Sequence, residues 1–181
     1  MIRQLIERTI RKRVAGVGAV LLLALSVATP ATASDFILRV DGLACPFCAY
    51  GVEKKLLAVP GVASIEVLLD EGQIVLSFSR EAELDVAALY SAVEKAGFTL
   101  RGLLVRDAVG TLSRDGGDEL FLTSSDPRIT FRVSLDTEND LPAVLLDGPS
   151  QVVASGTVTD FHALPAELVV SEIAAAGTRR P

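Results

Sequence analysis

Residues 42–78 read GLACPFCAYGVEKKLLAVPGVASIEVLLDEGQIVLSF and carry the strongest structural signals of the chain. After the two cysteines, apolar residues recur at helical spacing, at Ala49, Val52, Leu56 and Val59. Pro60-Gly61 supplies a stop signal, so we predict a helix that begins within the cysteine pair and ends before this proline. Apolar residues then alternate with polar ones on both sides of the turn Asp70–Gln73, which predicts two antiparallel strands.

The flanking sequence extends this pattern in both directions. Upstream, alternation predicts a strand at Phe36, Leu38 and Val40. Downstream, a second helical stripe is predicted at Val86, Leu89, Val93 and Ala96, and a final strand at residues 98–104. The resulting β-α-β-β-α-β order predicts a ferredoxin-like domain over residues 36–105.

From residue 106 the pattern changes to short apolar runs separated by turn clusters. Five strands are predicted, at Ala108–Leu112, Glu119–Thr123, Ile129–Leu135, Gln151–Val158 and Leu168–Ile173. We expect them to form a small all-β, OB-like barrel over residues 106–175, with a helical turn within residues 136–146. Gly156 lies where the fourth strand must bend. The fold class is therefore α+β, and residues 176–181 are expected to form a flexible tail.

The N-terminus has the order of an export signal. Five basic residues occur among the first thirteen, an apolar run covers Val14–Ala28, and Ala31-Thr32-Ala33 fits a cleavage site. We predict a signal peptide over residues 1–33, with cleavage after Ala33 and a periplasmic location. The alternative is a retained membrane anchor, although the run is shorter than the ~20 residues that a spanning helix prefers. No later stretch is long enough to span a bilayer.

Composition excludes several classes of function. The 181-residue chain has one His, two Cys and a formal net charge of −6. Beyond residue 13 it holds 12 basic and 22 acidic residues, whereas nucleic-acid binding needs a basic surface. A Ser-His-Asp hydrolase or a multi-cysteine zinc module is improbable, and no enzymatic activity is expected. The single histidine, His162, is interpreted as a surface loop residue rather than a ligand.

The chemistry of the chain is concentrated in Cys45 and Cys48. Cys45 is predicted in a loop and Cys48 in the first helical turn after Pro46, where backbone N–H groups and the helix dipole stabilise thiolates. Two thiolates without a third cysteine or a neighbouring histidine suit Cu(I) or Hg(II) better than tetrahedral zinc. Lys95 either offsets the charge of a dithiolate complex or is simply solvated.

These residues resemble the heavy-metal-associated domain, the module of copper chaperones, copper-ATPase N-termini and the periplasmic mercuric-ion-binding protein. That family carries G-M-x-C-x-x-C; here Gly42, Cys45 and Cys48 match, and Leu43 replaces the methionine. Two further motifs also match in register, at Pro60-Gly61-Val62 and Ala96-Gly97-Phe98. The resemblance implies that Cys45 and Cys48 are metal ligands and that Phe98 covers them. A shorter likeness, over residues 152–173, is to the OB-fold haem chaperone of cytochrome c maturation, and it implies only a barrel.

The sequence thus predicts an exported metal-binding protein or metallochaperone that holds one Cu(I) or Hg(II) ion between Cys45 and Cys48. Its expected partner is a metal transporter or another thiol protein, and we expect a monomer. Two alternatives stay open for the same cysteines. One is a periplasmic thiol-disulfide redox protein. The other is a structural disulfide, although a four-residue loop constrains little of the unfolded chain.

Overall fold

The structure is a computed structural model that describes residues 34–79, 81–135 and 148–177. The expected signal peptide, the expected helical turn within residues 136–146 and most of the expected tail lie outside these ranges. Among the described residues, no helix combines the length and apolar character needed to cross a bilayer.

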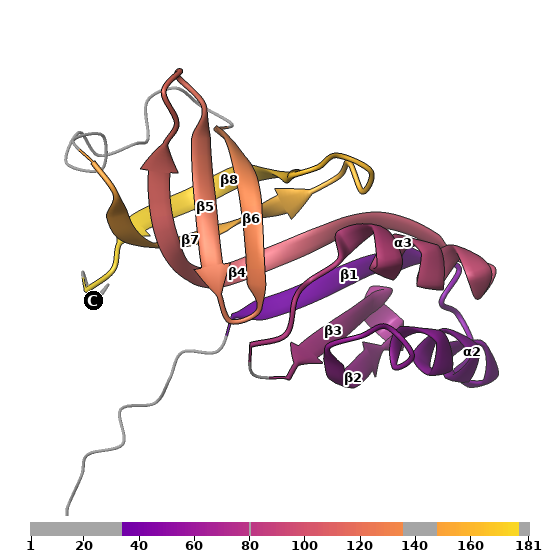
Figure 1. Ribbon diagram of the computed structural model, residues 1–181. Coiled ribbons are helices and arrows are strands. Elements are labelled where there is room, and N and C mark those ends of the chain that lie inside the picture. Colours follow the sequence, from indigo (N-terminus) through magenta and orange to yellow (C-terminus); the bar gives the residue numbers. More distant parts are fainter. Residues whose placement is uncertain (1–33, 80, 136–147, 178–181) are drawn as a thin grey trace, which may run out of the picture. The chain divides into compact units, whose positions relative to one another are not determined.

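The first part of the described chain has the predicted β-α-β-β-α-β order. Its elements are β1 (Asp35–Asp41), α2 (Pro46–Leu56), β2 (Val62–Leu68), β3 (Gln73–Phe78), α3 (Val86–Lys95) and β4 (Thr99–Arg114), with a short 3-10 turn at Leu69–Glu71. The strands lie antiparallel in the order β2-β3-β1-β4. Figure 1 shows both helices beside this sheet, so the ferredoxin-like prediction is confirmed.

The core of this module follows from the apolar spacings in the sequence. The alternating residues of β1 and the helical stripes of α2 and α3 are buried, including Phe36, Leu38, Val52, Leu56, Leu89 and Val93. Asp85 caps α3 by accepting a hydrogen bond from the Ala88 N–H at 2.9 Å. Gly97, with a φ of 86°, ends that helix by taking the left-handed conformation that favours glycine.

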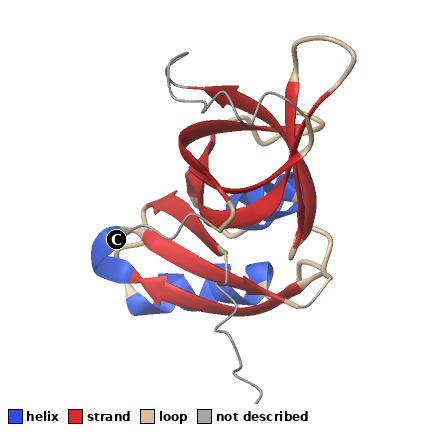
Figure 2. Cartoon of the chain, turned by 90° about the vertical axis from the view of Figure 1, so that its left-hand side faces the viewer, coloured by secondary structure: helices blue, strands red, loops and turns tan. Residues whose placement is uncertain are grey.

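The second part of the chain forms a closed five-stranded barrel, visible as a ring in Figure 2. The C-terminal half of β4 is followed by β5 (Leu120–Ser125), β6 (Arg128–Leu135), β7 (Ser150–Val158) and β8 (Ala166–Ala175). The pairing runs β4-β5-β6-β8-β7 and returns to β4, and β6 and β8 are parallel. The predicted small all-β unit is therefore confirmed.

The structure corrects one prediction, because the strands expected at residues 98–104 and 108–112 are a single 16-residue strand, β4. The charged pair Arg106-Asp107 interrupts the apolar pattern, but it forms a bulge within the strand instead of ending it. The pairing of β4 with β7 shifts between Val105 and Ala108, and Asp107 has a φ of 51°. The Asp107 N–H donates to the Ser155 hydroxyl at 3.0 Å, so the bulge keeps its backbone donor satisfied.

A second irregularity lies at Gly156, where the pairing of β7 with β8 shifts between Ser155 and Gly156. A Cβ at this position would overlap the backbone of Val169 and lie 3.0 Å from the Cα of Val170. The two strands thus approach so closely that only glycine fits.

We expect Gly156→Ala to lower the free energy of unfolding by about 1–3 kcal/mol, because the added methyl group forces the backbones apart. Urea denaturation of the purified protein measures this. Gly116→Ala is the control, since no atom lies within 4 Å of its added Cβ, and it should change stability by less than about 0.5 kcal/mol. Equal stability of the two variants would contradict the close approach.

Candidate metal centre

The loop that carries the cysteines is fixed by its contacts with the core. It begins at Gly42, whose φ of 87° is in the left-handed region. The Phe98 ring lies next to Gly42, since a Cβ added to Gly42 would be 3.6 Å from the nearest carbon of that ring. Leu43 is 4% exposed and joins the core, so leucine provides the buried anchor at the position where the resemblance expects methionine.

Cys45 is the N-cap of α2. Its backbone is extended, and its Sγ accepts a hydrogen bond from the Cys48 N–H at 3.2 Å. Its carbonyl oxygen accepts from the N–H groups of Cys48 and Ala49, both at 3.1 Å. Pro46 begins the helix, where a missing N–H costs nothing. Cys45, one of the two metal ligands predicted from the sequence, therefore also accepts a backbone N–H that would otherwise lack a partner at the start of α2.

Cys45 and Cys48 are joined in a disulfide, with their Cα atoms 5.3 Å apart. Both residues are half-buried, whereas Phe47 between them is 92% exposed and Tyr50 is 68% exposed. The first turn of α2 holds no acidic residue, and its last turn holds Lys54 and Lys55. The reduced pair would lie at the positive end of the helix dipole, which stabilises thiolates.

The two sulfurs are the only ligands that the described residues bring together here. No group of three or more His, Cys, Asp or Glu side chains able to hold a metal occurs within the described ranges. The site can therefore supply two thiolates at a partly exposed loop, which suits a soft ion of low coordination number. It does not supply the four ligands of a structural zinc site.

The other residues considered in the sequence lie apart from this pair. Lys95 is exposed in the last turn of α3, directly before the turn that leads to Phe98. His162 packs edge-on against Tyr90, with ring centres 4.9 Å apart, and Phe161 stacks on the same Tyr90 ring at 5.3 Å. Desolvation raises the pKa of Tyr90, and Glu94 raises it further. Sequence reasoning did not find this aromatic cluster, because α3 and the β7–β8 loop are far apart in the chain.

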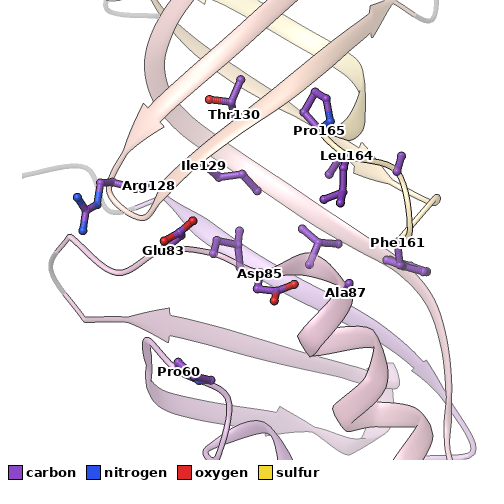
Figure 3. A pocket seen from close by; sticks show the side chains of 14 residues that line it. Pro60, Glu83, Asp85, Ala87, Arg128, Ile129, Thr130, Phe161, Leu164 and Pro165 are labelled. Carbon is purple, nitrogen blue, oxygen red and sulfur yellow. The ribbon is translucent and has the colours of Figure 1, made fainter.

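The cysteines do not line the cleft shown in Figure 3. That cleft, of about 670 Å³, lies between the start of α3, the start of β6 and the β7–β8 loop. Its wall is mostly apolar, with Glu83, Asp85 and Arg128 as its charged residues. The candidate metal centre is thus a partly exposed loop outside this cleft.

Fold and loop together define a class: small ferredoxin-like modules with a CxxC pair between the first strand and the first helix. The heavy-metal-associated domain model matches residues 37–99, and the chain belongs to that family.

Curated relatives are similar to about a third of the chain. The copper chaperone CopZ of Staphylococcus aureus (strain bovine RF122 / ET3-1) is 34% identical over 65 residues, which cover 36% of this chain and 94% of the relative. Copper-transporting ATPase 2 of Rhizobium meliloti (strain 1021) is 40% identical over 62 residues. That match covers 34% of this chain but only 7% of the ATPase.

Two solved structures also match. A structure described as a CopZ metallochaperone is 30% identical, with a TM-score of 0.34, covering 36% of this chain and 97% of that one. The N-terminal domain of PacS from Synechocystis PCC6803 is 33% identical, with a TM-score of 0.32. That match covers 37% of this chain and 92% of the PacS domain structure.

The backbone of the loop yields a stability prediction. We expect Gly42→Ala to lower the free energy of unfolding by about 1–2 kcal/mol, because an L-residue resists the left-handed conformation. The matched control is Gly51→Ala, inside α2 with open space around its Cβ. This control should raise stability by up to about 1 kcal/mol, because alanine favours a helix more than glycine does. Thermal unfolding of both variants measures the difference, and the same sign for both would refute this account of the loop.

Proposed function

We propose that this protein is a metallochaperone that carries one soft ion between the Cys45 and Cys48 thiolates. The observation that carries the proposal is the placement of the two cysteines at the N-terminus of α2, on a partly exposed loop, where reduction of their disulfide would leave a pair of thiolates. Soft thiolates bind Cu(I) and Hg(II) well, and two ligands leave room for a third thiolate from outside. A partner with its own thiols can therefore take the ion by ligand exchange.

Copper is the ion that the relatives favour, since their names describe a copper chaperone and a copper-transporting ATPase. We therefore propose Cu(I) as the cargo and keep Hg(II) as the competing ion, because the same two thiolates serve both. The receiving partner would be a metal transporter or another thiol protein. No catalytic step is part of this function, since the ion is carried and not transformed.

Titration of the reduced protein with Cu(I), under competition with a chelator, tests the proposal. We expect one tightly bound ion per chain, and we expect a Cys45→Ser/Cys48→Ser variant to lose this binding. Repeating the titration with Hg(II) ranks the two ions. The alternative reading, a thiol-disulfide redox protein, would be favoured if the reduced protein bound neither ion but reduced or oxidised the dithiols of a substrate protein.

We further propose that the chain is exported, on the basis of the basic, apolar and small-residue order of residues 1–33. The domains would then be the signal peptide, the metal module at 36–105, the barrel at 106–175 and a tail at 176–181. The strand order of the barrel supports the OB-like interpretation, and its role would be to position the metal module at its partner.

Export predicts a defined mature N-terminus. When the complete chain is produced in a bacterium with a periplasm, we expect the periplasmic protein to begin at Ser34. N-terminal sequencing and intact mass of the periplasmic fraction measure this. Recovery of a membrane-bound form that still contains residues 14–28 would instead indicate a retained anchor.

A further inference from the structure

Two exposed aromatic side chains flank the Cys45–Cys48 disulfide. Phe47, between the two cysteines, is 92% exposed, and Tyr50, one turn further along α2, is 68% exposed. Pro46 is also exposed, and we call these three exposed residues at the start of α2 the aromatic patch. Single exposed apolar residues are ordinary, whereas exposed apolar residues that gather on one face are typical of an interaction surface.

The helix itself explains why the aromatic patch points outward. Residues three apart lie on the same side of a helix, so Phe47 and Tyr50 share one face. The buried face of α2 consists of Ala49, Val52 and Leu56. The core of the module thus does not use Phe47 and Tyr50, and both rings stay available for a contact from outside.

We propose that the aromatic patch is the docking surface for a protein dithiol that reduces the Cys45–Cys48 disulfide and so makes the site competent for metal. This inference rests on the proposed function, because a disulfide offers no thiolate to a metal ion. The occupant follows from what the patch surrounds: an S–S bond is opened by an attacking thiolate. The first turn of α2 holds no acidic side chain that would repel an approaching thiolate.

The exchange is a two-electron transfer in two steps. A partner thiolate attacks the Cys48 Sγ; the bond between Cys45 and Cys48 breaks, a mixed disulfide forms at Cys48, and Cys45 leaves as a thiolate. Cys45 is the better leaving group, because its Sγ accepts the Cys48 N–H at the helix N-terminus. The partner's second thiolate then attacks the partner sulfur that is bonded to Cys48. This breaks the mixed disulfide, frees Cys48 as a thiolate and leaves the partner with a disulfide of its own. The two protons of the partner dithiol pass to the released thiolates or to solvent.

Comparing a protein dithiol with a small one isolates the docking contact. The oxidised protein is reduced by thioredoxin in one series and by dithiothreitol in the other, and free thiols are counted over time by alkylation and mass spectrometry. We expect Phe47→Ser/Tyr50→Ser to slow reduction by thioredoxin about tenfold, which corresponds to about 1.4 kcal/mol of lost contact energy. Reduction by dithiothreitol should stay within about twofold, because a small dithiol needs no docking surface.

Leu164→Ser is the matched control, because Leu164 is 91% exposed on the β7–β8 loop and lies outside the aromatic patch. It should leave both rates unchanged. Equal slowing of both reductants by the patch variant, or no slowing of either, would overturn the inference. Cu(I) titration of chemically pre-reduced protein separates this result from the proposed function. One ion bound by pre-reduced protein, together with a thioredoxin rate that is insensitive to the patch, would refute the docking surface alone.

Discussion

The hydrogen bonding of β4 along both of its edges is the constraint on which the rest of the structure depends. Its first half pairs with β1 from Asp35–Arg106 to Asp41–Thr99, with one register shift between Arg39 and Val40, and so completes the ferredoxin-like sheet. Its second half pairs with β5, and β7 closes the barrel against it. The position of the cysteine loop also follows from this strand. Because Asp41 pairs with Thr99, the next residue, Gly42, comes to lie beside Phe98.

Much of the fold could be predicted because its signals are local. Helical spacing located α2 and α3, and alternation located most strands, since both patterns reflect which side chains face one core. The continuity of β4 could not be predicted in this way. Arg106-Asp107 has the composition of a strand end, but its bulge is supported by the hydroxyl of Ser155, 48 residues further along the chain.

In the candidate site too, features with a local sequence signal could be predicted and features that depend on distant residues could not. Cys45 and Cys48 were identified from their spacing and from the proline between them, which also indicates the helix start. The exposure of Phe47 and Tyr50 follows from the helical register once α2 is fixed, so the sequence contained the signal for the aromatic patch. The cluster of Tyr90, Phe161 and His162 had no such signal, because its geometry arises only when the barrel loop meets α3.

The Sγ of Cys45 has two tasks under the proposed function, since it caps α2 and binds the cargo. Because this sulfur accepts a hydrogen bond at the helix start, the stability of the first turn of α2 and the bonding state of the Cys45 Sγ are thermodynamically linked. This linkage is reciprocal. A change that strengthens the hydrogen bond from the Cys48 N–H to the Cys45 Sγ would change the affinity for the ion, and binding of the ion would change the stability of the first turn of α2. A partner that draws Cys45 away must compete with a backbone amide of this chain as well as with Cys48. Under the proposed function, the start of α2 thus contributes directly to how readily the ion would be released.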